Sequence, residues 1–238
     1  MSPKPLLSLS ALALVALGPT SFGPPTLCVP FEIGNAESLP FGSAPFEGAK
    51  DYDLGRLRAD TMKILGASTD AEVHFETLRR ATVYLMSGGK TERKKQQQTG
   101  KLAADLHEAL RTRVLDVVSA PRTSKRAQAL AWFDLGLFEL DMDIIGTPRK
   151  GRIWPFLDKA ATLVGDDPGL DVCLFAAGFS QRKETWWRPH LARALSAPDT
   201  LSPRTRTNLL RLGARFLGKK DMESLRKDYG PRLGEGKR

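Results

Sequence analysis

Cysteine and histidine are scarce in this chain, which has two of the former and three of the latter among 238 residues. Cys28 and Cys173 are too few to build a disulfide scaffold, although they can form one bridge in an oxidising compartment. The alternative is a buried thiol at Cys173 and a loop thiol at Cys28. His74, His107 and His190 are far apart and match none of the His/Cys spacings of metal sites. We therefore expect neither a metal site nor a disulfide-built fold.

Motifs for phosphate binding and acyl transfer are also missing. Residues 87–91 read Ser-Gly-Gly-Lys-Thr and end like a phosphate loop, but Tyr84 stands where the loop needs its first glycine. No Gly-x-Ser-x-Gly elbow occurs, so the nucleophile of an α/β-hydrolase is absent. With no catalytic or cofactor motif, we expect a binding or scaffolding protein that has no catalytic activity and no cofactor.

No apolar run in the chain is long enough to cross a membrane, yet the N-terminus is apolar. Lys4 precedes twelve apolar or small residues, Leu6–Leu17, and a Gly-Pro pair follows them. This order is typical of a secretory signal peptide, and a spanning helix would need about 20 residues. The sequence predicts a signal peptide over residues 1–23 and a protein exported to the periplasm, the envelope or the cell exterior.

The net charge of +9 lies entirely in the last quarter of the chain. Residues 178–238 carry fifteen Lys and Arg against six Asp and Glu, whereas the preceding 177 residues carry 21 of each sign. Such a surplus attracts anionic partners and says nothing of the fold. We predict that the partner is a protein or an anionic polymer, and the expected export disfavours nucleic acid.

Proline and glycine are concentrated after the predicted signal peptide. Residues 24–52 contain prolines at positions 24, 25, 30, 40 and 45. These prolines exclude a helix there and disfavour a sheet strand. Phe31, Ile33 and Leu39 are interspersed among them. We predict an extended Pro/Gly-rich arm that lies over a hydrophobic groove, with a flexible leader as the alternative.

From residue 53 onward the apolar residues recur with a helical period rather than in two-residue alternation. The sequence predicts an all-α domain over residues 53–229 and a basic flexible tail over 230–238. Eight or nine helices joined by short turns would form antiparallel hairpins, in a right-handed solenoid-like stack or an irregular bundle. Lys90–Gly100 is either a loop or a solvated helical extension. The helices are expected near residues 54–64, 70–85, 102–118, 124–140, 155–164, 168–177, 190–195, 203–216 and 221–229.

One helix resembles a known family. Around Trp132 the chain reads Trp-x-x-Leu-Gly, ending at Gly136. This resembles the first helix of a tetratricopeptide repeat, in which the small Gly lets a neighbouring helix approach closely. The resemblance then departs, because Glu139 replaces the family's aromatic residue and Pro148 its second-helix alanine. It implies a stack of helical hairpins used for protein–protein contacts.

Four acids gather near the end of the apolar helix that starts at residue 124: Asp134, Glu139, Asp141 and Asp143. Members spaced four or seven residues apart share a helix face, and paired carboxylates can hold a divalent cation or perform acid–base chemistry. A carboxylate-dependent enzyme is therefore one alternative function. The competing interpretation is salt bridging or solvation, because acids at a helix C-terminus oppose the helix dipole.

The candidate binding patch comprises Arg182, Lys183, Trp186, Trp187, Arg188 and His190. Adjacent residues on a helix point about 100° apart, so both tryptophans can be buried only in a deep site. An exposed Trp flanked by guanidinium groups suits an anionic polysaccharide, a nucleic acid strand or an acidic protein tail. The second alternative function is therefore binding of an anionic polymer or acidic protein by the basic quarter. The competing interpretation is two packing anchors below a solvated charged face.

Overall fold

The computed structural model of the protein describes residues 25–42, 46–87, 93–144, 153–196 and 198–231. Within these ranges the prediction of an all-α fold is confirmed, and the one pairing of extended backbone is an isolated bridge between Phe41 and Gly48. The predicted signal peptide (1–23) and most of the predicted tail lie outside the described residues. The helices are α1 (Pro25–Cys28), α2 (Leu57–Ala67), α3 (Ala71–Ser87), α4 (Arg93–Ser119), α5 (Lys125–Ile144), α6 (Ile153–Val164), α7 (Pro168–Ser180), α8 (Glu184–Ser196), α9 (Pro203–Leu212) and α10 (Met222–Tyr229).

Several helices begin where the sequence supplies a cap. The Asp167 carboxylate accepts a hydrogen bond from the Leu170 N–H at 3.2 Å, and Pro168 is the first residue of α7. The Ser202 hydroxyl accepts from the Thr205 N–H at 3.0 Å at the start of α9. Both caps satisfy a backbone donor that the helix itself leaves unpaired, and both N-termini are where the sequence predicts them.

Two predicted helices are longer than their apolar stripes. Helix α4 begins at Arg93, so the described part of Lys90–Gly100, residues 93–100, is helical rather than a loop. Helix α8 begins at Glu184, six residues before the predicted start at His190, and therefore contains both tryptophans of the candidate patch. After α9 the chain makes one π-helical turn, η3 (Gly213–Leu217).

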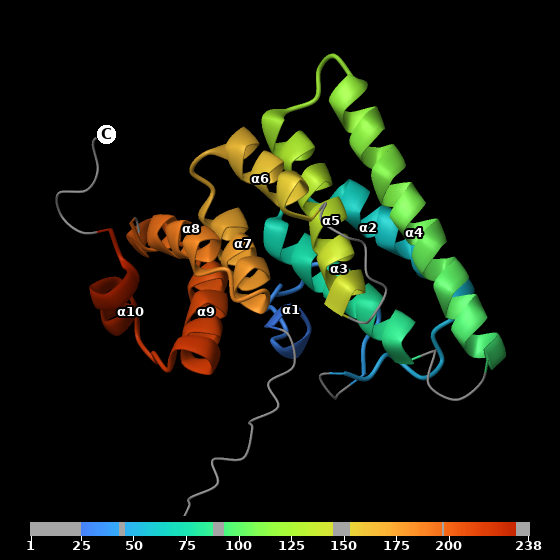
Figure 1. The fold of residues 1–238 in the computed structure, drawn as a ribbon, viewed down its shortest axis with the longest axis horizontal. Coiled ribbons are helices and arrows are strands. Elements are labelled where there is room, and N and C mark those ends of the chain that lie inside the picture. The colour runs from blue at the N-terminus through green and yellow to red at the C-terminus, as the bar shows by residue number, and fades with distance from the viewer. Residues whose placement is uncertain (1–24, 43–45, 88–92, 145–152, 197, 232–238) are drawn as a thin grey trace, which may run out of the picture.

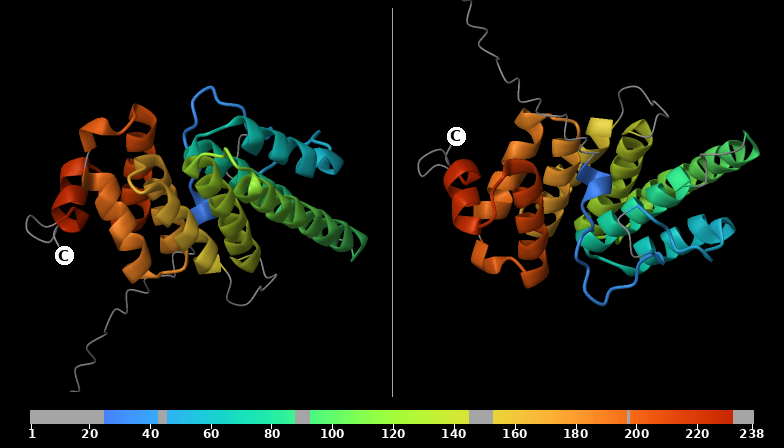
Figure 2. Two further views of the ribbon diagram at one scale, coloured as in Figure 1. Left: turned by 90° about the horizontal axis from the view of Figure 1, so that it is seen from above. Right: turned by 90° about the horizontal axis from the view of Figure 1, so that it is seen from below.

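The helices form two neighbouring groups that share a continuous core (Figure 1). Helix α5 packs against α3, α4 and α6, while α8 and α9 pack against α7, and α10 packs against α8. Contacts of α7 with α3 and α6 join the groups, and α1 lies between α3 and α7. Figure 2 shows α4 reaching toward one end of the molecule and α10 lying at the other. The described helices of the basic quarter, α8 to α10, therefore lie toward one end (Figures 1 and 2).

Glycines set the closest helix contacts. A Cβ atom added at Gly136 of α5 would lie 2.8 Å from Cδ2 of Leu157 on α6. One added at Gly178 of α7 would lie 2.5 Å from Cε3 of Trp186 on α8. Side-chain carbons do not approach so closely, so these two helix pairs depend on the missing Cβ atoms.

Residues 26–41, here called the N-terminal segment, cross the surface of α3 and α9. The segment begins within α1, so the expectation that prolines exclude any helix from 24–52 is wrong. Pro25 is the first residue of that short helix, where its missing N–H leaves no hydrogen bond unmade. Beyond α1, Phe31 is buried and stacks on Phe75 of α3, with ring centroids 4.1 Å apart.

None of the helices within the described ranges combines the length and the apolar character that spanning a membrane requires.

Candidate binding site

Trp187 of the predicted patch lies in the core. Its side chain is 5% exposed and packs between α7 and α10. Its ring centroid lies 5.5 Å from that of Phe175, 5.3 Å from that of Phe179 and 5.9 Å from that of Tyr229. This tryptophan is a packing anchor, because rings at these distances interact by edge and tilted contacts that exclude water.

Trp186 is half-buried and connects α8 to α6. Its indole N–H donates to the Asp158 carboxylate at 2.5 Å. Its ring lies 4.8 Å from that of Trp154 and 4.5 Å from that of His190, measured between centroids. The Lys183 ammonium lies 4.2 Å from the Trp154 centroid, which is cation–π range. The Trp186 side chain therefore contacts Asp158, Trp154 and His190.

The other members of the patch divide between the interior and the surface. His190 is buried, and its Nδ1 lies 2.8 Å from the Asp171 carboxylate, which also accepts from Arg193 at 2.7 Å. Arg182, Lys183 and Arg188 are exposed. Arg188 pairs with Glu184 at 2.9 Å and lies over the Tyr229 ring at 5.6 Å. The structure thus exposes three cations of the patch and buries Trp187 and His190.

Two surface hollows flank α10, and we call them the α8–α10 hollows. The first has a volume of about 640 Å³ and lies between α8 and α10, where Arg188, Lys227 and Tyr229 are among its lining residues. The second, of about 690 Å³, includes Arg206, Arg226 and again Lys227 in its lining. Sequence reasoning missed Arg206, Arg226 and Lys227 as site residues, although the charge surplus of the last quarter pointed to this region.

The predicted acid cluster on α5 is drawn into the interior. Asp134 is fully buried; it lies 2.8 Å from Nδ1 of His74 and also forms an ion pair with Arg113. Glu139 is buried, with Oε1 2.8 Å from Nε2 of His107. For these two acids the partners come from α3 and α4, so salt bridging describes them better than a shared cation site.

Asp141 and Asp143 differ from that pair. Asp141 is fully buried, accepts a hydrogen bond from the Thr82 hydroxyl at 3.2 Å, and lies near the Thr26 hydroxyl and Arg79, which with Thr82 lower its pKa less than burial raises it. Burial raises the pKa of Asp141 to about 7. Asp143 is half-buried. None of the four acids lines the α8–α10 hollows or a third hollow between α2 and α4.

Both cysteines are free thiols in the structure, so the bridge that the sequence allows is not formed. Cys173 is fully buried in α7, and Cys28 is half-buried in α1 rather than in a loop. Burial raises the pKa of both thiols, which disfavours the reactive thiolate. Among the described residues, no three His, Cys, Asp or Glu side chains gather closely enough to hold a metal ion.

Comparison of the chain with protein-family models, with curated proteins and with solved structures finds no match. Its function must therefore be inferred from the geometry of its own surfaces.

Proposed function

We propose that the protein is an exported binding module without catalytic activity, which holds an anionic partner at the α8–α10 hollows. The observation that carries this proposal is the pair Arg226 and Lys227 on α10. Both side chains are exposed, both line a hollow, and neither forms an ion pair with any described residue. Exposed, unpaired cations beside a concave surface favour an anionic ligand.

The acids around these hollows do not all oppose such a ligand. Glu184 is paired with Arg188, and Asp228 is paired with Lys219. Each pair leaves little net charge. Asp199 and Glu223 also line the second hollow, but Arg206, Arg226 and Lys227 outnumber them there. Arg182 and Lys183, exposed at the start of α8, add positive charge on the same end of the molecule. An acidic polysaccharide or an acidic protein tail has the charge that this end attracts.

The proposal includes the export and the helical-hairpin arrangement that the sequence predicts. Residues 1–23 would be removed as a signal peptide, and successive helices would stack as hairpins. The close approach of α5 to α6 at Gly136, and of α7 to α8 at Gly178, supports such stacking. The tetratricopeptide resemblance of the helix around Gly136 agrees with a role in binding.

The experiment compares two matched double variants of the protein. Arg226→Ala/Lys227→Ala removes both cations from the hollows, and Arg122→Ala/Lys125→Ala removes the same charge from exposed positions near the start of α5. Binding to heparin and to poly-glutamate is measured over a series of salt concentrations. We expect wild-type affinity to fall steeply with salt, because surface charge attraction is screened within about 10 Å at 0.1 M.

The α10 variant should bind several-fold more weakly than wild type, while the α5 variant should bind nearly as well. Salt-insensitive binding, or an equal loss in both variants, would contradict the proposal. A preference for heparin over poly-glutamate at equal charge would identify the polysaccharide as the partner class, and the reverse preference would identify an acidic protein.

A further inference from the structure

Side chains of the helices hold the main chain of the N-terminal segment. The Phe31 N–H donates to the Glu76 carboxylate of α3 at 3.0 Å. The Leu39 carbonyl accepts from the Arg80 guanidinium of α3 at 2.6 Å. Both contacts are made to backbone groups, so they do not depend on which side chains the segment carries at these positions.

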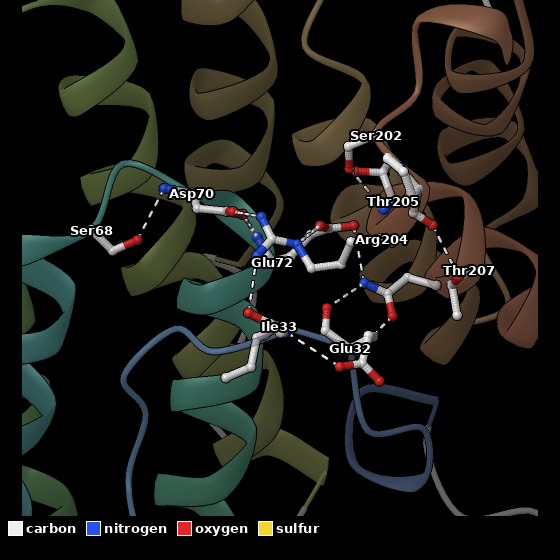
Figure 3. Close-up of polar contacts among 12 residues, drawn as sticks. Glu32, Ile33, Ser68, Asp70, Glu72, Ser202, Arg204, Thr205 and Thr207 are labelled. Atoms are coloured by element: carbon white, nitrogen blue, oxygen red, sulfur yellow. Dashed lines mark hydrogen bonds and ion pairs between the residues drawn. The ribbon is translucent and has the colours of Figure 1, made fainter.

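Helix α9 holds the same segment from another side (Figure 3). The side-chain amide of Asn208 accepts from the Glu32 N–H at 2.6 Å and donates to the Glu32 carbonyl at 3.0 Å. Arg204 donates to the Ile33 carbonyl at 3.0 Å. In a sheet, the N–H and C=O groups of a strand residue bond to the neighbouring strand. Here the Asn208 amide bonds both of these groups of Glu32 and takes the place of that strand.

The side chains of the segment alternate as those of a strand do. Val29, Phe31 and Ile33 are buried, whereas Glu32 between them is exposed. The buried face meets apolar side chains of the helices, as in the stacking of Phe31 on Phe75. Residues 29–33 therefore turn one apolar face toward the helices, and the surface of α3 and α9 that this face covers is here called the groove between α3 and α9.

The groups that line this groove are held in place by the helices themselves. Asn208 also donates to the Glu72 carboxylate at 3.0 Å, and Arg204 forms ion pairs with Asp70 and Glu72 (Figure 3). Glu76 accepts from Arg80 at 2.7 Å, independently of the segment. Glu72, Glu76 and Asn208 are each 1% exposed. These groups are buried beneath the segment, so a peptide that takes its place must offer the same backbone N–H and C=O groups, because an unpaired buried polar group is costly.

We propose that the groove between α3 and α9 binds extended apolar segments of partner proteins, and that residues 29–33 occupy it as a competitor within the same chain. The partner segment would be strand-like, with apolar side chains at alternate positions and an aromatic ring at the central one. This surface is separate from the α8–α10 hollows, so the proposal does not depend on the anionic-partner function.

The test uses the full chain and a fluorescent peptide with the sequence of residues 26–40. The variant Phe31→Asp/Ile33→Asp places two charges on the apolar face of the segment, so the segment should leave the groove. The sequences of the helices are unchanged. We call this the released variant. We expect saturable anisotropy binding of the peptide to this variant. Wild type should bind about tenfold more weakly or worse, because its tethered segment competes at high effective concentration. A peptide with the same two aspartate substitutions should not bind.

A matched pair of further substitutions shows where the peptide binds. Asn208→Ala in the released variant removes the amide that grips the backbone and should weaken peptide binding about tenfold. Thr207→Ala changes the adjacent residue of α9, whose hydroxyl bonds the Pro203 carbonyl of its own helix at 2.9 Å, and should leave peptide binding unchanged. An equal effect of both substitutions would place the peptide elsewhere and overturn the proposal.

Circular dichroism checks that the released variant remains helical. If the released variant is not helical, hydrogen exchange on the wild-type protein replaces the anisotropy assay. Excess peptide should then displace the segment and accelerate exchange at the chain's own Phe31 and Glu32 amides. Peptide that neither binds the released variant nor accelerates this exchange overturns the proposal. So does a concentration-dependent dimer that binds no peptide, since the groove would then accept only the segment of a second copy.

Discussion

Replacing Asp141 by asparagine tests whether a carboxyl group is held in the core as the structure places it. The side chain is fully buried and accepts a hydrogen bond from Thr82, and burial raises its pKa to about 7. An aspartate in an unfolded chain has a pKa of about 3.9. Because the folded pKa is the higher one, Asp141 stabilises the fold most at low pH, and that contribution is lost as the pH rises toward and through 7.

The two pKa values set the size of the effect. Ionising Asp141 costs the folded state about 4 kcal/mol once the pH exceeds both values, and about 3 kcal/mol of that cost arises between pH 5 and pH 8. Asparagine cannot ionise. Its amide adds a penalty for unpaired N–H groups, but this penalty is the same at both pH values. The stability of Asp141→Asn relative to wild type should therefore rise by about 3 kcal/mol from pH 5 to pH 8.

Urea denaturation followed by circular dichroism at the two pH values measures this difference. Asp143→Asn is the control, because it makes the same change on the same helix at a half-buried position. Its effect should stay within about 1 kcal/mol at both pH values. A stability difference between Asp141→Asn and wild type that is the same at pH 5 and pH 8 would refute the reasoning, since the buried carboxyl group would then not titrate in this range.

Two further substitutions test the packing and the buried ion pairs by the same urea assay. Gly136→Ala should destabilise by about 1–3 kcal/mol, because the new Cβ meets Leu157, whereas Gly100→Ala, in an open part of α4, should stabilise by up to about 1 kcal/mol through helix propensity. Stabilisation by both would show that α5 and α6 are not in close contact. Asp134→Ala should cost about 3–5 kcal/mol, because it leaves the Arg113 guanidinium and the buried His74 ring without their carboxylate partner, while exposed Asp116→Ala should change stability by less than about 0.5 kcal/mol. Similar small losses in both would contradict the buried pair.

Much of the candidate site was outside the reach of sequence reasoning. The charge count located the basic end, but the hollows exist only because α10 packs on α8. The sequence allowed each of the two tryptophans to be either an exposed binding residue or a packing anchor. Trp187 is a packing anchor, because its ring contacts those of Phe175, Phe179 and Tyr229. No sequence pattern marked Asn208, because its bond partner Glu32 is 176 positions away.

The helices and their ends follow from local sequence, because a helical period and a cap such as Asp167 act within a few residues of the backbone they order. Which buried groups meet depends on how the helices pack. His74 and Asp134 are 60 positions apart, and their pairing is a consequence of α3 lying against α5. The seat of the N-terminal segment has the same origin, since its backbone is satisfied by side chains that packing alone brings together.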